Sequence, residues 1–316
     1  MERMIPNTMI ETEETPDLLV NIRSISYSST SFDLIIENTK LYKGEIVSVI
    51  GSNGAGKSTL FEILLNIRRN KKHDVQICQE PAEKWISKVQ NKKSLGTLLQ
   101  YCDFPMMIKV REIVELHRVL YQLVSTEILE SFQIAELLDK KYHLLSRGQK
   151  QRVDLYFALA HLPQIAFLDE PTSGLDSYFC DVLYNILGIM KQRKEHLIVQ
   201  ISQNYRELLI VDKVLWLKTG RLIAIGSPGE LIDKYLGSYC VIVIADNVFD
   251  FEQLRTELNS INNTKIVEDR DKLQLFIYCN KENKNQILEQ INNRELNSFS
   301  ISKVSISDLL RYATNQ

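Results

Sequence analysis

A glycine-rich segment of the chain, GSNGAGKST at residues 51–59, contains residue types that bind phosphate groups. It fits the pattern G-x-x-x-x-G-K-[ST], in which glycines let backbone N–H groups close around phosphate oxygens that side chains would obstruct. The Lys57 ammonium would neutralise β- and γ-phosphates, and the Ser58 hydroxyl would hold Mg²⁺. A glycine-rich turn that matches by chance is the alternative, which the flanking strand and helix patterns disfavour. The predicted nucleotide-binding residues of this phosphate loop are Gly51, Asn53, Gly54, Ala55, Gly56, Lys57, Ser58 and Thr59.

Two adjacent acids end a second motif, IAFLDEP at residues 165–171. Asp169 would stand at the tip of an apolar strand, where its carboxylate suits Mg²⁺, through a bound water. Glu170 would then point at the γ-phosphate and polarise the attacking water. Paired acids also end many strands in helix-capping turns, but the phosphate loop upstream favours the catalytic interpretation.

A second candidate anion site starts the segment LLSRGQKQRVDLYFALAH, residues 144–161. Ser146 and Gly148 stand at the head of an apolar helix pattern. The first N–H groups of a helix lack intrahelical partners and the helix dipole favours negative charge, so these residue types suit an anion. The phosphate loop lies elsewhere in the chain, so the motifs leave open which anion this site binds.

Strands and helices alternate around these motifs, which predicts an α/β fold with a mostly parallel sheet covered by helices. The run EIVSVI before the phosphate loop is short, apolar and β-branched, as expected of a buried parallel strand. Further strands are expected at 95–100, 164–169 and 196–202, and helices at 57–69, 110–139 (two segments), 149–161 and 177–193.

The character of the sequence changes near Gly237. The order β-α-β-β-α-β that follows predicts a small ferredoxin-like α+β module. We therefore expect three parts: a flexible tail at 1–16, a nucleotide-binding domain at 17–236 and a C-terminal accessory domain at 237–316.

The composition is that of an ordinary globular chain, with 44% hydrophobic and 25% charged residues among 316. A formal charge of −2 gives no general attraction to nucleic acid, so none is expected as a partner. Five scattered cysteines fit free thiols better than disulfides or a zinc site. No apolar run approaches the roughly 20 residues that span a bilayer, so a membrane function would need another chain.

The order and spacing of the three motifs, closing with AFLDEPTSGLD at 166–176, resemble the ATP-binding subunit of an ABC transporter over about residues 18–236. The C-terminal extension ending in ISDLLRYAT is similar to that of bacterial drug- and bacteriocin-export ATPases of the bacitracin-resistance type. The resemblance implies a P-loop NTPase fold with a helical subdomain. It also implies ATP and Mg²⁺ as ligands, ATP hydrolysis coupled to export, a separate transmembrane permease, and a peripheral location at the cytoplasmic face of the membrane.

The resemblance also suggests an anion for the second site. In such ATPases two nucleotide domains face head to tail, so Ser146, Gly148 and Gln149 would hold the γ-phosphate of the partner's ATP. This implies a second nucleotide-binding subunit, in a homodimer or a heterodimer.

Three further positions match the family's pattern. Tyr27 would stack on adenine, although a packed strand tyrosine is the alternative. Gln100 would sense Mg²⁺ and the membrane partner. Asp176 would contact the second subunit, cap the helix from Ser177, or do both. The segment 101–118 resembles the region that docks on the permease, unless its apolar residues, Phe104, Met106, Met107 and Ile108, are ordinary core.

Two positions depart from the family's pattern. Arg147 stands where glycine is more frequent. Gln203 occupies the position of a histidine that contacts the γ-phosphate, and glutamine can donate a hydrogen bond but cannot become cationic. The five histidines look like surface or packing residues rather than substitutes. We therefore expect slow hydrolysis, with Glu170, Gln203 and Gln100 as the catalytic set.

Two other functions stay open. A non-transport ABC ATPase, such as a translation factor or an Fe–S assembly component, is disfavoured by the single nucleotide domain and the lack of a basic linker. A nucleotide-gated regulatory subunit that hydrolyses slowly is favoured by Gln203.

Overall fold

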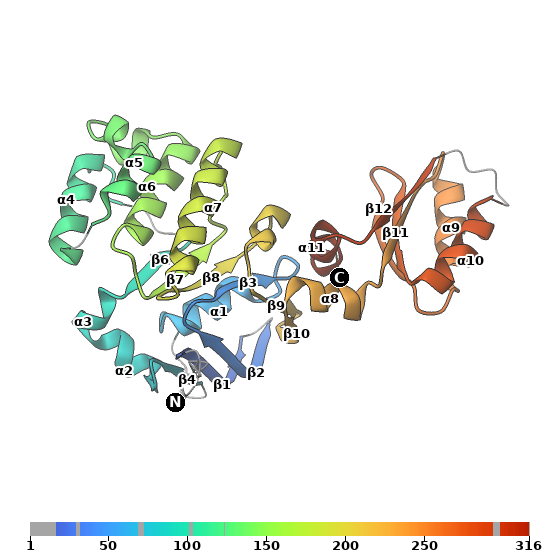
Figure 1. The fold of residues 1–316 in the computed structure, drawn as a ribbon, viewed down its shortest axis with the longest axis horizontal. Helices are drawn as coiled ribbons and strands as arrows, with labels where there is room; N and C mark the ends of the chain where they lie inside the picture. Colours follow the sequence, from blue (N-terminus) through green and yellow to red (C-terminus); the bar gives the residue numbers. More distant parts are fainter. Residues whose placement is uncertain are drawn as a thin grey trace, which may run out of the picture.

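A ten-stranded sheet, in the order β5-β4-β1-β2-β10-β9-β3-β8-β7-β6, is the framework of the larger part of the molecule (Figure 1). The computed structural model describes residues 17–29, 32–68, 73–100, 104–122, 124–292 and 298–315. The predicted tail at 1–16 lies outside these residues, as does 101–103 of the predicted docking segment. The strands are β1 (Leu18–Ser28), β2 (Asp33–Tyr42), β3 (Ile46–Ile50), β4 (Asp74–Ile77), β5 (Glu80–Pro81), β6 (Leu95–Leu98), β7 (Ile165–Asp169), β8 (Leu197–Ile201), β9 (Lys213–Lys218) and β10 (Arg221–Gly226).

The sheet has a parallel half, which carries the motifs, and a half that is largely antiparallel. β9, β3, β8, β7 and β6 pair in parallel. Hairpins join β1 to β2, β4 to β5 and β9 to β10, and a hairpin makes its two strands antiparallel. The expected parallel sheet is therefore found around the motifs, while the hairpins give the rest its antiparallel character.

The central strands are buried on both faces, as the apolar run before the phosphate loop predicts. Every residue of β3, β7 and β8 is buried. On β3, Ile46 and Ile50 belong to one core, and Val47 and Val49 to the other, because side chains alternate along a strand. Helices must therefore cover both faces of this half of the sheet.

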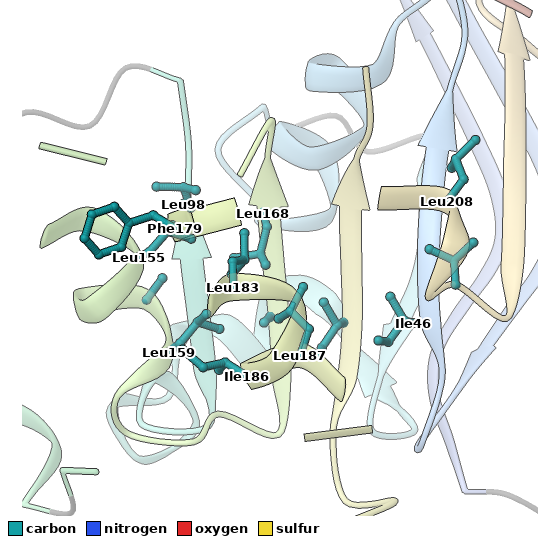
Figure 2. Close-up of a cluster of buried hydrophobic side chains, with 14 of the residues drawn as sticks. Ile46, Leu98, Leu155, Leu159, Leu168, Phe179, Leu183, Ile186, Leu187 and Leu208 are labelled. Carbon is teal, nitrogen blue, oxygen red and sulfur yellow. The ribbon is translucent and has the colours of Figure 1, made fainter. Parts of the chain in front are cut away.

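Two groups of helices supply this cover (Figure 1). α1 packs Leu60 and Phe61 into one core. α6 and α7 pack against the other face, where Figure 2 shows Leu183 of α7 beside Leu168 of β7 and Leu159 of α6 beside Ile186. The helices of this part are α1 (Lys57–Leu64), α2 (Ala82–Ser87), α3 (Val89–Lys92), α4 (Val110–Tyr121), α5 (Thr126–Ser131), α6 (Arg147–Leu159), α7 (Ser177–Gln192), α8 (Pro228–Tyr235) and the short 3₁₀ helices η1 (Ile134–Leu137), η2 (Tyr142–Leu144) and η3 (Tyr205–Leu209).

Among the helix boundaries that differ from the sequence-based expectation, two have a clear local cause. α1 ends at Leu64 rather than near residue 69, because Asn66 adopts a left-handed backbone (φ 54°), which stops a helix. α6 begins at Arg147, two residues earlier than expected, because Ser146 caps it.

The C-terminal residues form a four-stranded antiparallel sheet in the order β12-β13-β11-β14. This strand order, with two helices on one face, is the split β-α-β arrangement that the element order predicts. α9 and α10 cover one face with their own core, which includes Phe251, Leu258 and Ile287. The elements are β11 (Tyr239–Ile244), α9 (Val248–Asn259), β12 (Lys265–Asp269), β13 (Gln274–Cys279), α10 (Lys281–Asn292), β14 (Phe299–Lys303) and α11 (Ile306–Thr314).

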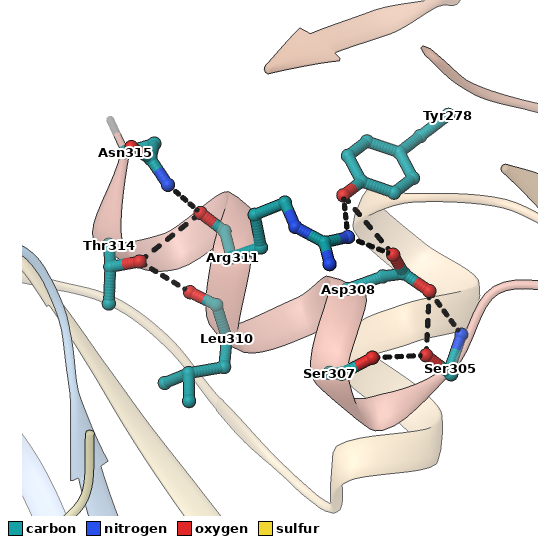
Figure 3. Close-up of polar contacts among 8 residues, drawn as sticks. All are labelled: Tyr278, Ser305, Ser307, Asp308, Leu310, Arg311, Thr314 and Asn315. Atoms are coloured by element: carbon teal, nitrogen blue, oxygen red, sulfur yellow. Dashed lines mark hydrogen bonds and ion pairs between the residues drawn. The ribbon is translucent and has the colours of Figure 1, made fainter. Parts of the chain in front are cut away.

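The last helix, α11, lies between the two sheets and packs on α8, η3 and β3 of the larger part (Figure 1). Its Tyr312 contacts both Trp216 of β9 and Tyr278 of β13, edge to face. Figure 3 shows Asp308 accepting hydrogen bonds from Arg311 (2.6 Å) and the Ser305 hydroxyl (2.7 Å). α11 thus joins the accessory module to the nucleotide-binding part, and the two parts share buried residues of one hydrophobic cluster. The domain boundary at residue 237 therefore stays a prediction from the sequence.

Among the described residues, no helix has the length and apolar character needed to cross a membrane.

Candidate functional site

The phosphate loop connects β3 to α1, and its backbone requires glycine at two positions. Gly51 has φ +148°, and a Cβ there would lie 2.1 Å from the Leu217 carbonyl oxygen. Gly56 has φ +101° and precedes α1, where a Cβ would lie 2.6 Å from Phe32. Gly54 also has a positive φ, but a Cβ there would meet nothing within 4 Å. The outer side of the loop is therefore open, as a phosphate-binding loop requires.

Lys57 stands at the centre of the loop. Its ammonium donates to the carbonyl oxygens of Gly51 and Ser52, both at 2.9 Å. Burial lowers its pKa, while the nearby carboxylates of Glu170 and Asp169 raise it. A cation held in this way matches the charge of a bound phosphate.

Two of the predicted Mg²⁺ ligands, Ser58 and Asp169, contact each other next to the phosphate loop. The Ser58 hydroxyl donates to Asp169 Oδ2 at 3.1 Å. Burial raises the Asp169 pKa and the Ser58 hydrogen bond partly offsets this. The described residues contain no group of three or more His, Cys, Asp or Glu side chains that would suit a metal. A hydroxyl and one carboxylate fit Mg²⁺ bound together with nucleotide oxygens and water.

The two predicted catalytic side chains contact each other. Gln203 Nε2 donates a hydrogen bond to Glu170 Oε1. Glu170 holds a left-handed backbone (φ 49°) at the tip of β7, and its N–H donates to the Ile201 carbonyl oxygen at 3.2 Å. Gln203, where the resemblance implies a histidine, thus contacts the Glu170 carboxylate through its neutral amide.

Lys57, Ser58, Glu170 and Gln203 line a cavity of about 800 Å³, here called the nucleotide cavity, whereas Asp169 is buried beside Ser58 and does not line it. Tyr27 and Gln100 line this cavity together with residues of the phosphate loop, while their roles toward adenine and Mg²⁺ stay predictions. Ala55 is buried beneath the loop, and Gly51 faces a different cavity. The lining residues are Tyr27, Ser29, Phe32, Asn53, Gly54, Gly56, Lys57, Ser58, Thr59, Arg68, Gln100, Glu170 and Gln203.

Three residues of this lining, Ser29, Phe32 and Arg68, were not among the predicted site residues. Arg68 donates to the Tyr27 hydroxyl at 2.8 Å, its guanidinium lies 5.5 Å from the centroid of the tyrosine ring, and it also pairs with Glu62. Arg68 thus fixes the predicted adenine-stacking residue. No motif marks Arg68, because its contact depends on the turn that ends α1.

The residues of the second anion site lie at the start of α6 and outside the nucleotide cavity. Ser146 caps the helix, with its hydroxyl accepting from the Gln149 N–H at 3.3 Å and its own N–H donating to the Gln149 side chain at 3.2 Å. Gly148 lies close to the turn that follows Glu170, because a Cβ on Gly148 would be 2.7 Å from the Gly174 carbonyl oxygen. This site therefore does not face the phosphate loop of its own chain.

Contacts join this helix to the turn after Glu170. Arg147, the first departure from the family pattern, donates to the Ser173 hydroxyl at 2.5 Å. Gln151 donates to the Pro171 carbonyl oxygen at 2.9 Å. The predicted N-cap role of Asp176 is confirmed, since its carboxylate accepts from the Phe179 N–H at 3.0 Å.

No histidine is among the residues that line the nucleotide cavity. His117 and His161 are buried among the helices, with His117 Nε2 3.3 Å from His161 Nδ1. Burial lowers the pKa of each of these two histidines to about 4. His196 contacts the Pro163 carbonyl oxygen at 2.8 Å. These three histidines thus have packing roles, and His73 and His143 are half-buried outside the nucleotide cavity.

The predicted docking segment divides into buried and exposed residues. Phe104 is half-buried and packs edge to face on Tyr142 and Phe157, so it packs against the core. Met106 and Met107 are 71% and 67% exposed. Ile108 packs against the core, while α4 exposes further apolar side chains, namely Leu116, Val119 and Leu120.

A second cavity, of about 760 Å³, lies beside the phosphate loop, and no motif of the sequence predicts this cavity. Its wall includes Ser52 and Gln203 on one side and Leu310 and Arg311 of α11 on the other. The C-terminal helix therefore borders the loop that carries Gln203.

Comparison with known proteins gives matching sequences and folds. The family described as "ABC transporter" matches residues 37–173. The energy-coupling factor transporter ATP-binding protein EcfA of Methanothermobacter thermautotrophicus is 34% identical over 230 residues, which are 67% of this chain and 72% of that protein. The protein of the same name from Malacoplasma penetrans is 28% identical over 250 residues, covering 75% and 86% of the two chains.

Two solved structures share the fold. The cbiO1 protein of Clostridium perfringens, described as part of the ABC transporter complex cbiONQ, is 25% identical with a TM-score of 0.54, covering 69% of this chain and 92% of that one. An ATP-binding cassette solved as a dimer, in a post-hydrolysis state bound to ADP and Pi, is 22% identical with a TM-score of 0.57, covering 66% and 98%.

Proposed function

This chain belongs to the ATP-binding subunits of ABC transporters, and from that premise we propose that it binds Mg·ATP at the phosphate loop, hydrolyses it with Glu170 and energises export through a separate permease. The observation that carries the proposal is the convergence of Lys57, Ser58 and Glu170 on one cavity, with Asp169 hydrogen-bonded to Ser58 beside it. Each of these groups has a distinct task in phosphoryl transfer.

The residues of this cavity divide the work of hydrolysis. Lys57 and the loop N–H groups neutralise and orient the phosphates. Ser58 and Asp169 would hold Mg²⁺, which supplies countercharge to the β- and γ-phosphates. Glu170 accepts a hydrogen bond from the attacking water, because the Gln203 amide holds Oε1 and leaves Oε2 to the water. Tyr27, steadied by Arg68, offers a ring face to adenine.

The partner in the ATP-bound state is a second copy of this chain. One chain contains both a phosphate loop and the anion site at Ser146, and these two sites do not meet within it. Two copies facing head to tail would place each helix N-terminus on the other copy's nucleotide. A cassette of similar fold has been solved as a dimer bound to ADP and Pi, which is compatible with a dimer here.

The permease docks on an exposed apolar surface formed by Met106, Met107 and the outer face of α4. Apolar side chains of this size gather at protein interfaces. The chain would then lie at the cytoplasmic face of a membrane. A nucleotide-gated regulator that hydrolyses slowly is a second candidate, because a neutral amide, that of Gln203, contacts Glu170 at the position where the resemblance implies a histidine.

Three variants test the proposed nucleotide site. Lys57→Ala should abolish tight ATP binding, measured with a fluorescent ATP analogue, and should leave the circular dichroism spectrum unchanged. Glu170→Gln should bind ATP, fail to hydrolyse it and accumulate as a dimer in size-exclusion chromatography with light scattering. Glu83→Gln, on the exposed side of α2, is the matched control and should behave as wild type. Unchanged ATP affinity in Lys57→Ala would remove the basis of the proposal.

A further inference from the structure

A buried carboxylate, Glu207, lies close to the catalytic pair and has no task in the proposed reaction. It belongs to η3, four residues after Gln203, and is 1% exposed. The Thr172 hydroxyl donates to its Oε1 at 2.6 Å. Burying a carboxylate is unfavourable unless hydrogen bonds compensate, so this contact calls for a role.

Two hydrogen bonds join the same pair of segments. One segment is the turn from Glu170 to Thr172, and the other is the loop from Gln203 to Glu207. Gln203 donates to Glu170 at one end, and Thr172 donates to Glu207 at the other. The Thr172–Glu207 bond therefore fixes the spacing across which the catalytic contact forms.

A buried polar network extends this link to the strand that precedes the phosphate loop. The hydroxyls of Ser48 on β3 and Ser202 lie 2.8 Å apart, and Gln200 donates to Ser48 at 3.1 Å and to the Glu207 carbonyl oxygen at 3.3 Å. Ser48, Gln200 and Ser202 are fully buried. A network with little access to solvent holds its members in one arrangement.

The groups around the Glu207 carboxylate show which of its hydrogen bonds is strongest. Burial raises the Glu207 pKa, while the Thr172 and Ser202 hydroxyls and the backbone N–H groups of Asn204 and Thr172 lower it. Among the described residues, Oε2 has no hydrogen bond of normal geometry, so these contacts are weaker than the one from the Thr172 hydroxyl to Oε1. The bond to Thr172 is thus the strong link of the carboxylate to the catalytic turn.

We propose that Glu207 is a positioning residue for ATP hydrolysis, because its hydrogen bond from Thr172 holds the Gln203 loop against the turn that carries Glu170. The inference rests on the proposed function, in which Glu170 activates the water. Glu207 does not line the nucleotide cavity, so it acts through Gln203 and Glu170 rather than on the nucleotide.

The test measures kcat and KM for ATP in the full-length chain. Thr172→Val removes the hydroxyl and keeps the shape, and kcat should fall about tenfold while KM changes less than about twofold. Thr172→Ser keeps a hydroxyl and should restore most of the rate. Glu207→Gln keeps an acceptor oxygen for Thr172, so its kcat should stay within about threefold of wild type. Adding Thr172→Val to Gln203→Ala should cost no further rate, since both act on one contact.

Each outcome decides the matter. A valine variant with wild-type kcat, or a serine variant as slow as valine, overturns the positioning role. A multiplicative loss in the double variant does the same, because the two changes then act independently. Should Thr172→Val fail to fold in thermal unfolding, Glu207→Gln against Glu207→Leu makes the same comparison. Glu170→Gln serves as the reference: normal hydrolysis in that variant refutes the proposed function itself, whereas loss there with no effect at Thr172 refutes this inference alone.

Discussion

Replacing Gln203 with histidine should accelerate ATP hydrolysis. The amide of Gln203 already donates to Glu170, so the position is within reach of the catalytic acid. An imidazolium would make the same contact with a full positive charge, and it would also stabilise negative charge that develops on the γ-phosphate. The substitution therefore adds a positive charge and leaves the hydrogen-bond donor in the same place.

The size of the effect follows from the cost of losing a hydrogen-bond donor to developing charge, which is typically about 2.7–4 kcal/mol in the barrier. The neutral Gln203 amide keeps part of that interaction. A charged donor that regains about 1–1.5 kcal/mol would raise kcat roughly tenfold. KM for ATP should stay nearly constant, because the gain arises mainly in the transition state.

The assay is steady-state phosphate release at saturating ATP, in the presence of the proposed permease, between pH 6 and 8.5. The gain should shrink at the alkaline end, where the new histidine loses its charge. Tyr205→His, two residues along the same loop and half exposed, is the control for added histidine alone and should not be faster. A Gln203→His variant no faster than wild type at any pH would refute the reasoning, as would an equal gain in Tyr205→His.

Three further predictions concern stability and docking. Leu309→Ala, in the buried face of α11, should lower the free energy of unfolding by about 2–5 kcal/mol in denaturant titrations, whereas Ile301→Ala on the exposed strand β14 should change it by less than about 0.5 kcal/mol. Stability should fall as the pH drops from 6.5 toward 4. Burial holds the pKa values of His117 and His161 at about 4, so the unfolded chain binds more protons in that window, and His117→Phe should reduce the slope. Met107→Asp should leave ATP binding unchanged and weaken co-purification with the permease.

Each of these predictions has a contradicting result. An unfolding free energy that is insensitive to Leu309→Ala would mean that α11 does not stabilise the fold. A pH profile that is flat between 6.5 and 4 would mean that the two histidines charge in the folded state. Undiminished co-purification of Met107→Asp would place the docking surface elsewhere.

The motifs of the nucleotide cavity were predictable because their geometry is local. Glycines with positive φ, a lysine at the head of a helix and an acid at the tip of a buried strand are each set by a few neighbouring residues. The order of elements after Gly237 likewise sufficed for the accessory sheet, since the split β-α-β connection allows few strand orders.

What the sequence could not give depends on contacts between distant residues. Arg68 reaches Tyr27 across the open end of the nucleotide cavity, and Glu207 reaches Thr172 between two loops. The pattern of α11 shows an amphipathic helix but not that its Tyr312 would join two sheets. The antiparallel half of the large sheet was missed because strand direction depends on which strands become neighbours.

The most direct test of the central claim, that two copies complete each other's ATP sites, is the ATPase activity of mixed variants. Lys57→Ala lacks a working phosphate loop and keeps Ser146, while Ser146→Arg keeps the phosphate loop and lacks the anion site. Each variant alone should be nearly inactive. In an equal mixture, half of the dimers combine the two variants and contain one complete site of two, so the account predicts recovery of about a quarter of the wild-type rate. A mixture as inactive as its two components would contradict the account.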